Sequence, residues 1–404
     1  MAHSRRAVRK ISDSQNTRLA WAVVESLEQR RLLSGVSFAA AVNYPVGGAP
    51  DAVQRADLNG DGKLDLISAN INGTVSVLLG NGDGTFQAAQ TFSDGLGSNT
   101  QVHFAIFPFS DSNNDNSLGL VLLDDTNQVS ILLSNGNGTF QPPQILTLSD
   151  TAYSIAVGRF SGDGDADLVV GYADGTVGVL LGNNDGTFQA PVTYVAADYG
   201  ITAVAVADLT NNGHEDIVVS SSGIDRNNGS INVLLGNGDG TFRGEQPVVS
   251  ESYGEFGLGA IDLDGDGIPD LIAGTSAGAY QVFLGNGDGT FRSPIITTQT
   301  NIDAAAISDL TGDGTADRIT ANDVTDMVGI NLGSGNGTFR NVTNILVGNS
   351  PVDVTPGDFN GDGQPDIVVA NIGSSSLSVI LNTTPRPVSN LFSAPTKVKV
   401  SGTP

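Results

Sequence analysis

Short runs of β-branched and other apolar residues alternate along the chain with segments rich in glycine, asparagine and aspartate. One unit contains four such runs, GLGAI at 257–261, DLIAG at 270–274, AYQVFL at 279–284 and FRSPIIT at 291–297. Apolar runs of this length, bounded by turn-forming residues, predict β-strands. The Asn-Gly and Asp-Gly pairs between them tolerate the positive φ of tight hairpins. The pattern therefore predicts four antiparallel strands in each unit.

The unit is repeated along the chain. The heptapeptide GNGDGTF or a close variant ends at six phenylalanines, Phe86, Phe140, Phe188, Phe242, Phe291 and Phe339, which are 48 to 54 residues apart. An acidic nonapeptide with the same spacing begins at seven positions, Asp57, Asp111, Arg159, Asp208, Asp262, Asp309 and Asp358. Four-stranded repeats of this length are typical of β-propeller blades.

The ends of the repeated region predict how the ring closes. After the last acidic nonapeptide only three strands are legible, and no seventh GNGDGTF follows. The stretch 35–47 aligns with 186–198, matching Phe38 to Phe188 and Tyr44 to Tyr194. We therefore expect an N-terminal strand to complete the last blade and remove the open sheet edges. The predicted fold is an all-β, seven-bladed propeller over 36–384, between an N-terminal segment 1–35 and a tail 385–404.

Composition and charge restrict the function. The chain has 404 residues, 52 glycines, no cysteine and a net charge of −25. Residues 1–35 carry a net charge of +4, so the remainder, with 11 basic and 40 acidic residues, carries −29. Such a body repels nucleic acid and anionic lipid. No apolar run approaches the roughly 18 residues of a transmembrane helix. Without disulfides, a divalent cation is an obvious alternative crosslink.

The acidic nonapeptide follows the pattern D-x-[D/N/S/T]-G-D-G-x-x-D. Side-chain oxygens at positions 1, 3, 5 and 9 and the backbone carbonyl at position 7 can converge on Ca²⁺, and glycine at position 6 permits the turn. The side chains of the four complete copies are Asp57, Asn59, Asp61 and Asp65; Asp262, Asp264, Asp266 and Asp270; Asp309, Thr311, Asp313 and Asp317; and Asp358, Asn360, Asp362 and Asp366. The corresponding carbonyls belong to Lys63, Ile268, Thr315 and Gln364.

Three copies depart from this pattern. The fourth has Asp208, Thr210, Asn212 and Asp216, with the His214 carbonyl at position 7. The third has Arg159 at position 1, where its guanidinium can replace the cation, and keeps Ser161, Asp163, Asp165 and Asp167. The second keeps Asp111, Asn113 and Asp115 but has Asn116 and Gly119 at positions 6 and 9. We expect about four strong calcium sites and one or two weaker ones.

The loop sequences allow two other interpretations. They could be Asp/Gly-rich turns that bind no ion, although the acids recur at ligand positions in register. They could also be EF-hand loops, which require an acid at position 12 and a following helix. Position 12 is Ser68, Ala273, Thr320 or Val369, and strand sequence follows. The EF-hand interpretation is therefore excluded.

The paired elements DLNGDGKLD at 57–65 and LLGNGDGTF at 78–86 closely resemble FG-GAP/VCBS repeats, the blade units of integrin α-subunit propellers and of many secreted bacterial proteins. The resemblance covers about residues 36–384. It implies a seven-bladed propeller whose calcium loops join the first two strands of a blade, and it leaves the second, third and fourth copies as departures. For the GNGDGTF element we predict a hairpin whose phenylalanine packs between blades.

The N-terminal segment favours export. Residues 27–35, LEQRRLLSG, resemble the LEPR-XLL-type motif of exported bacterial surface proteins, with Gln29 in place of its proline. The alternative is a disordered or helical cytoplasmic extension. Weak calcium sites fill at the millimolar calcium found outside cells. We therefore expect an extracellular or cell-surface protein of a bacterium.

No catalytic arrangement is legible, because the three histidines, His3, His103 and His214, form no nucleophile–base pattern. We expect a non-catalytic, monomeric interaction or adhesion module that binds an extracellular protein or glycan. A lectin-like propeller is the first alternative, although the one tryptophan, Trp21, lies in the N-terminal segment. Six tyrosines could supply sugar platforms: Tyr153, Tyr172, Tyr194, Tyr199, Tyr253 and Tyr280. A polysaccharide lyase is the second alternative.

Overall fold

The computed structural model describes residues 36–98, 101–110, 116–124, 127–222, 229–252, 255–275, 279–297 and 302–385. The chain divides into a compact unit Phe38–Asn382 and a second unit formed by Met1–Ser37 with Thr383–Pro404. The predicted export motif at 27–35 lies outside the described residues. Among the described residues, no helix is long and apolar enough to cross a bilayer.

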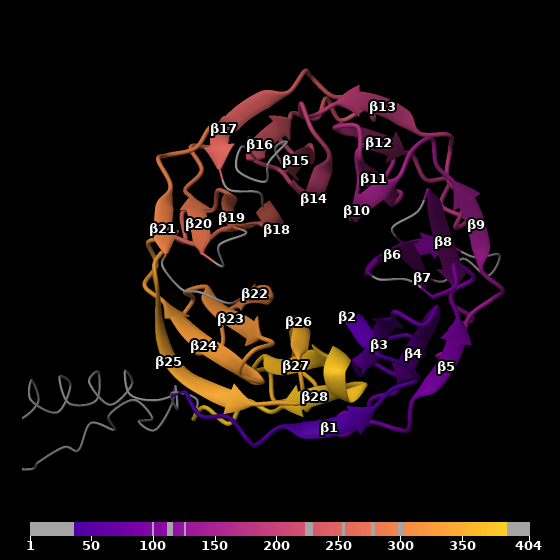
Figure 1. Cartoon of the computed structure of the whole chain (residues 1–404), viewed down its shortest axis with the longest axis vertical. Helices are drawn as coiled ribbons and strands as arrows, with labels where there is room; N and C mark the ends of the chain where they lie inside the picture. Colours follow the sequence, from indigo (N-terminus) through magenta and orange to yellow (C-terminus); the bar gives the residue numbers. More distant parts are fainter. Residues whose placement is uncertain are drawn as a thin grey trace, which may run out of the picture. The chain divides into compact units, whose positions relative to one another are not determined.

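The unit Phe38–Asn382 is a ring of seven four-stranded antiparallel sheets, here called blades 1 to 7 (Figure 1). From the centre outward, blade 1 contains β2 (Pro50–Ala56), β3 (Asp65–Asn70), β4 (Thr74–Leu78) and β5 (Gln90–Ser93). Blade 2 contains β6 (Val102–Ser110), β7 (Asn116–Asp124), β8 (Gln128–Leu133) and β9 (Gln144–Thr147). Blade 3 contains β10 (Ala152–Gly158), β11 (Asp167–Tyr172), β12 (Thr176–Leu180) and β13 (Val192–Val195).

The remaining blades repeat this order. Blade 4 contains β14 (Ile201–Ala207), β15 (Asp216–Ser221), β16 (Gly229–Leu234) and β17 (Gln246–Ser252). Blade 5 contains β18 (Glu255–Ile261), β19 (Asp270–Thr275), β20 (Tyr280–Phe283) and β21 (Ile295–Thr297). Blade 6 contains β22 (Ala304–Ser308), β23 (Asp317–Asn322), β24 (Met327–Gly333) and β25 (Phe339–Leu346). The predicted seven-bladed, all-β propeller is confirmed.

Blade 7 combines both ends of the ring. It contains β26 (Pro351–Gly357), β27 (Asp366–Asn371), β28 (Ser376–Ile380) and, as its outer strand, β1 (Val42–Pro45), with a short 3-10 helix η1 (Ile372–Ser374) between β27 and β28. Val42 pairs with Val379, and an isolated bridge joins Phe38 to Asn382. The predicted N-terminal closing strand is therefore confirmed, and every sheet has four strands.

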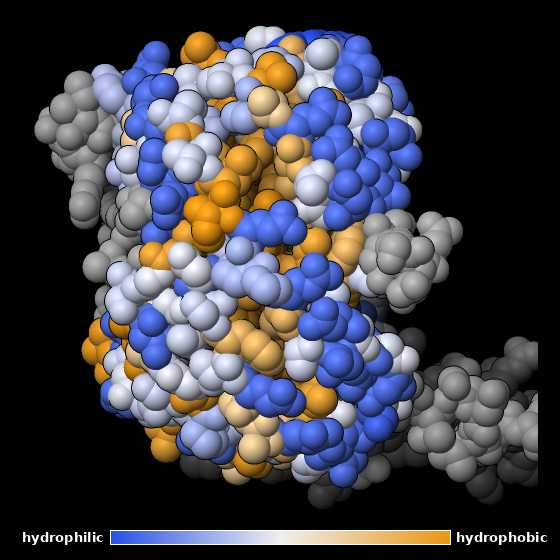
Figure 2. All heavy atoms as spheres, turned by 90° about the vertical axis from the view of Figure 1, so that its right-hand side faces the viewer, coloured by the Kyte–Doolittle hydropathy of each residue, from blue (hydrophilic) through white to orange (hydrophobic). Residues whose placement is uncertain are grey.

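The middle strands of the blades form the core. In β3 and β27 every residue is buried, because both faces of these strands pack against neighbouring blades. This double burial accounts for the apolar runs after most acidic loops; in blade 6 the run contains Arg318, which is itself buried. The outer strands β5 and β13 are largely exposed. On the side of the ring that carries β5, β9 and β13, hydrophobic residues form separate patches interrupted by hydrophilic ones (Figure 2).

The GNGDGTF hairpins join neighbouring blades. Phe86 of blade 1 contacts Tyr44 and Phe359 of blade 7 edge to face, with ring centroids 5.5 Å and 5.7 Å away. Gly84 in the same hairpin has φ of +84°, and a Cβ there would lie 2.7 Å from the side chain of Leu381. Glycine is therefore needed both for the turn and for the close approach. The predicted packing of this phenylalanine between blades is confirmed.

Candidate metal centre

The acidic loops connect the first and second strands of their blades, as the family resemblance implies. The loop 57–64 lies between β2 and β3, and the loop 262–269 lies between β18 and β19. Because every blade has the same antiparallel strand order, these connections emerge at the same rim of the ring. The apolar strands on either side hold the loop ends in place, so the oxygen donors sit on a rigid base.

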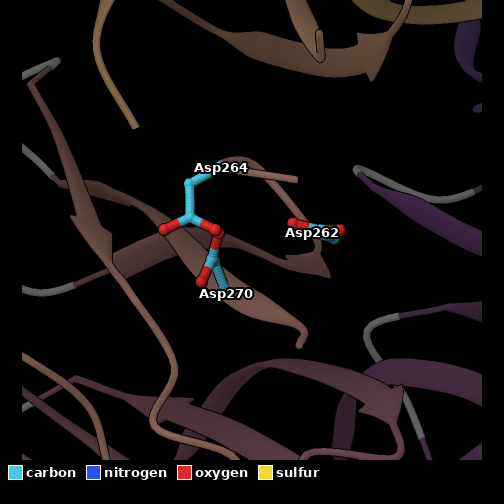
Figure 3. Close-up of side chains that lie close together, drawn as sticks. All are labelled: Asp262, Asp264 and Asp270. Carbon is cyan, nitrogen blue, oxygen red and sulfur yellow. The ribbon is translucent and has the colours of Figure 1, made fainter. Parts of the chain in front are cut away.

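The loop of blade 5 brings three carboxylates together. One oxygen each of Asp262, Asp264 and Asp270 lie within 4.8 Å of one another (Figure 3). Such proximity of like charges is costly without a cation, and oxygen donors of this type suit Ca²⁺. Among the described residues no other loop gathers three carboxylates this closely. The reason lies at position 3, which is Asn59, Thr311 or Asn360 in the other complete copies.

The carboxylate at position 1 organises the turn. Asp262 accepts the backbone N–H groups of Gly265 at 2.7 Å and Gly267 at 2.9 Å. Both glycines have φ near +80°, the left-handed conformation that L-residues avoid. Asp57, Asp309 and Asp358 make the same two contacts with the glycines of their own loops. The loops are therefore preformed, with glycine at position 6 making the predicted turn.

The aspartate at position 9 connects the loop to the rest of the blade. Asp270 is fully buried and accepts the backbone N–H of Leu263 in the loop and of Gly285 at the start of the hairpin, both at 2.8 Å. The same double contact is made in the other described loops by Asp65, Asp167, Asp216, Asp317 and Asp366. This anchoring role was missed by sequence reasoning. In blades 1 to 6 the recurrence of a GNGDGTF-type segment after each acidic nonapeptide is the signal that could have revealed it, whereas Asp366 of blade 7 binds Asn382 instead.

Burial raises the pKa of these position-9 carboxyls. The pKa of Asp317 and of Asp366 rises to about 6, chiefly because burial disfavours the charged form and secondarily because other loop aspartates lie nearby. The pKa values of Asp65, Asp167, Asp216 and Asp270 shift in the same direction for the same leading reason. A bound cation would offset both costs by favouring the ionised form.

Asp266, at position 5 of the blade 5 loop, is not part of the three-carboxylate cluster. Asp266 accepts the backbone N–H of Ile268 at 2.9 Å, and its other oxygen lies 4.0 Å from a guanidinium nitrogen of Arg292. A second nitrogen of Arg292 lies 3.9 Å from Asp264. Arg292 thus partly compensates the charge of this loop. Asp61, Asp313 and Asp362 likewise accept the N–H at position 7 of their own loops.

The loop of blade 4 retains cation donors despite its amide at position 5. Asp208 accepts the N–H groups of Asn212 and Gly213 at 3.1 Å and 2.7 Å. The hydroxyl oxygen of Thr210, at position 3, is buried and has no hydrogen-bond partner among the described residues. Buried polar oxygens normally have partners, so this one fits a cation ligand. The side chain of His214 is exposed, as predicted.

The loop of blade 3 carries its own positive charge. The Nε of Arg159 donates to the carbonyl oxygen of Gly164 at 3.1 Å, so the guanidinium folds over the loop. Ser161 donates its hydroxyl to Asp163 at 2.6 Å. The replacement of a cation by Arg159 stays a prediction. In blade 2, the candidate residues Asp111, Asn113 and Asp115 lie outside the described residues.

The acidic loop of one blade also contacts the next blade. The backbone N–H of Gly84, in the hairpin of blade 1, donates to the carbonyl oxygen of Phe359 at position 2 of the blade 7 loop, at 3.0 Å. Gly240 of blade 4 donates to Phe160 of the blade 3 loop in the same way, at 2.8 Å. Each such loop is therefore linked to strands in its own blade and to a hairpin in the following blade.

These observations define a seven-bladed propeller built from acidic-loop repeats. The sequence model of the FG-GAP-like repeat matches residues 57–118, 111–170, 159–219, 221–273, 262–320 and 309–369. The chain therefore belongs to the FG-GAP-like repeat family, and this part of the resemblance is confirmed. No curated protein matches the sequence of the chain.

Solved propellers share the fold at low sequence identity. The chain is similar to BBS1N in its complex with ARL6DN, with a TM-score of 0.58 and 16% identity over 86% of this chain and 97% of that chain. It is also similar to the BP39L lectin from Burkholderia pseudomallei, with a TM-score of 0.62 and 13% identity over 86% of this chain and 97% of that chain. At such identities the likeness concerns the fold alone.

Proposed function

We propose that this protein is a calcium-stabilised, non-catalytic interaction module that acts outside a bacterial cell and binds a protein or a glycan. The observation that carries the proposal is the convergence of Asp262, Asp264 and Asp270 within 4.8 Å. Ca²⁺ at this position would neutralise the clustered charge and hold the start of β19 against the loop. Equivalent loops repeat around the rim, so several ions would stabilise several blades at once.

The direct consequence is a contribution to stability. An ion that binds only the native state increases the free energy of unfolding by RT ln(1 + [Ca²⁺]/Kd). Such loops fill at millimolar calcium when their affinity is weak, which suits an extracellular location. The basic N-terminal segment with its LEPR-XLL-type motif supports the same location. The interaction role is supported by the two propellers described above, one solved in a complex with ARL6DN and one named as a lectin.

Calcium dependence is tested by thermal unfolding of the full chain in excess EDTA, in calcium and in magnesium. The melting temperature is expected to fall in EDTA and to recover more with calcium than with magnesium, which demands stricter octahedral geometry. Calorimetric titration is expected to find about four strong sites. An identical melting temperature in all three buffers would contradict the calcium assignment.

The lectin-like function is the second candidate, and the likeness to the BP39L lectin favours it. A glycan array probed with the labelled full chain separates the two candidates. Saturable binding to one class of glycan supports the lectin function. Binding to surface proteins of other cells, with no glycan bound on the array, supports adhesion through a protein ligand. Release of unsaturated sugars from an acidic polysaccharide would contradict the non-catalytic assignment and favour a lyase.

A further inference from the structure

Arg55 occupies an unusual place in the ring. It lies near the end of β2, the innermost strand of blade 1, and its Nη1 donates to the hydroxyl of Thr355 in the innermost strand of blade 7, at 3.0 Å. Its stem crosses Gly357, where an added Cβ would lie 2.4 Å from the Arg55 Cδ. Glycine at this position therefore makes room for the arginine between the two blades.

In the part of the chain that the structure describes, the positive charge of Arg55 has no ion-pair partner. None of the ion pairs in the described part of the chain involves Arg55, and its guanidinium makes no hydrogen bond there other than the one to Thr355. Burial lowers the pKa of the side chain, so its charge is partly desolvated. A guanidinium has five N–H donors in a planar fork, and leaving them unmatched in a half-buried site is costly. In a ring so rich in acids, the missing partner points to an external anion.

A cavity of about 370 Å³ opens beside this guanidinium. Its polar lining includes Arg55, Ser308 of blade 6 and Asp358 of blade 7. Its apolar lining includes Leu64, Pro356 and Pro365. A volume of this size lies at the lower end of the range for small-molecule sites, which are largely apolar with a few polar groups that fix orientation. The cavity thus suits a small ligand with one anionic group and an apolar face.

We propose that this cavity binds a small carboxylate, held by the Arg55 guanidinium that lines it. A carboxylate matches the planar fork in a bidentate manner. A dianion such as phosphate is disfavoured, because Asp358 lines the same cavity and the surrounding ring is strongly acidic. The hydroxyl of Ser308 can bond a ligand hydroxyl, and the proline and leucine side chains can cover the carbon skeleton. The carboxylate can be carried by a free organic acid or by an acidic sugar.

The cavity adjoins one proposed calcium loop through Asp358, but the inference rests on Arg55, which is not a proposed metal ligand. The test titrates the full chain in EDTA with glucuronate, acetate, glucose and inorganic phosphate, using calorimetry, because calcium would precipitate phosphate and could bridge a carboxylate to Asp358. Saturable binding of glucuronate or acetate, with no binding of glucose, supports the site. Tighter binding of glucuronate identifies an acidic sugar, and equal binding of both identifies a free carboxylate. Phosphate binding as tight as that of the carboxylates would overturn the carboxylate assignment.

Two substitutions connect the binding to the cavity. Arg55→Gln is expected to weaken carboxylate binding by about tenfold or more, because charge-assisted hydrogen bonds are lost. Arg55→Lys keeps the charge without the fork and is expected to bind with intermediate affinity. Arg340→Gln, at an exposed arginine of blade 6, is the matched control and should bind as the unaltered chain does. Unchanged affinity in Arg55→Gln, with its melting temperature preserved, would place the ligand elsewhere and overturn the proposal.

Discussion

The phenyl rings of Phe86 and Phe359 meet edge to face across the junction of blades 1 and 7, with their centroids 5.7 Å apart. Tyr44, on the N-terminal strand β1, also meets Phe86 edge to face, with ring centroids 5.5 Å apart. Three segments that are far apart in the sequence thus converge at the point where the ring closes. Edge-to-face aromatic pairs contribute beyond the area that they bury, so this junction is a focus of stability.

Substituting Phe86→Ala is expected to lower the free energy of unfolding by about 3–5 kcal/mol. The side chain is only 8% exposed, and its removal leaves a cavity between two blades. The measurement is denaturant unfolding of the full chain in calcium. Ile296→Ala, at a side chain 64% exposed on β21, is the control and should change stability by less than about 0.5 kcal/mol. Equal effects of the two substitutions would show that the junction is not critical.

A second contact across the same junction predicts a pH dependence. Asp353 of β26 accepts the backbone N–H of Val53 in β2 at 2.8 Å. Burial, with a smaller contribution from the charge of Asp51, raises the pKa of Asp353 to about 7. Since the unfolded value is near 4, the native state binds the extra proton between about pH 4 and pH 7. The contribution of this residue therefore destabilises the ring above pH 7 and disappears below about pH 4.

Asp353→Asn is expected to remove this contribution, so that the variant gains stability relative to the unaltered chain at pH 8 but not at pH 4. Unfolding free energies measured at pH 8, 6 and 4 give the difference directly. Asp83→Asn is the control. Hydrogen bonds from Thr85 lower the pKa of the exposed Asp83 carboxyl, so this variant should show no gain in stability at pH 8. A constant difference between Asp353→Asn and the unaltered chain across this pH range would contradict the prediction.

The repeat made most of the fold predictable from sequence. Glycine, asparagine and aspartate at regular intervals mark the turns, and in most blades the buried strand after the acidic loop is a largely apolar run, with Arg318 of blade 6 as an exception. The alignment of Phe38 with Phe188 located the closing strand, since each repeat carries the same strand at that place. The repeated turn residues and apolar runs therefore predicted both the four-stranded blade and the closed ring.

Contacts between blades could not be predicted in the same way. Asp353 and Val53 are 300 residues apart and belong to no shared motif. Arg55 stands two residues before its acidic loop, where the other blades have an apolar residue. Only the structure places it beside Thr355 and a cavity. The position-9 aspartates were predicted as ligands, a role that stays a prediction, while their hydrogen bonds to the hairpins depend on how the third strand returns beside the loop.

The double role proposed for position 9 predicts different results for two aspartates of one loop. Asp270→Ala is expected to destabilise the protein even in EDTA, because the buried N–H groups of Leu263 and Gly285 lose their acceptor. Each unsatisfied donor costs about 1–3 kcal/mol. Asp264→Ala is expected to remove the increment that calcium adds and to cost much less in EDTA, because the Asp266 N–H that it accepts is exposed to water. Unfolding of both variants with and without calcium makes the comparison, and equal destabilisation in EDTA would contradict the anchoring role.

The loop of blade 3 allows a test in which a calcium site is gained rather than lost. Arg159 closes this loop with a hydrogen bond to Gly164, while Ser161, Asp163 and Asp167 keep the ligand pattern at positions 3, 5 and 9. Arg159→Asp removes the internal cation and supplies the missing carboxylate at position 1. Calorimetric titration is therefore expected to find one more calcium ion per chain than in the unaltered protein.

The matched control is Arg159→Gln, which removes the guanidinium without adding a carboxylate. Because a complete site needs the acid at position 1 to organise the turn as Asp262 does in blade 5, this control is expected to gain no strong site. In EDTA, Arg159→Asp is expected to be less stable than Arg159→Gln, since it adds a negative charge to an acidic loop, and calcium is expected to reverse that order. An unchanged number of bound ions in Arg159→Asp, with the fold intact, would show that these loops do not bind calcium through the nonapeptide pattern.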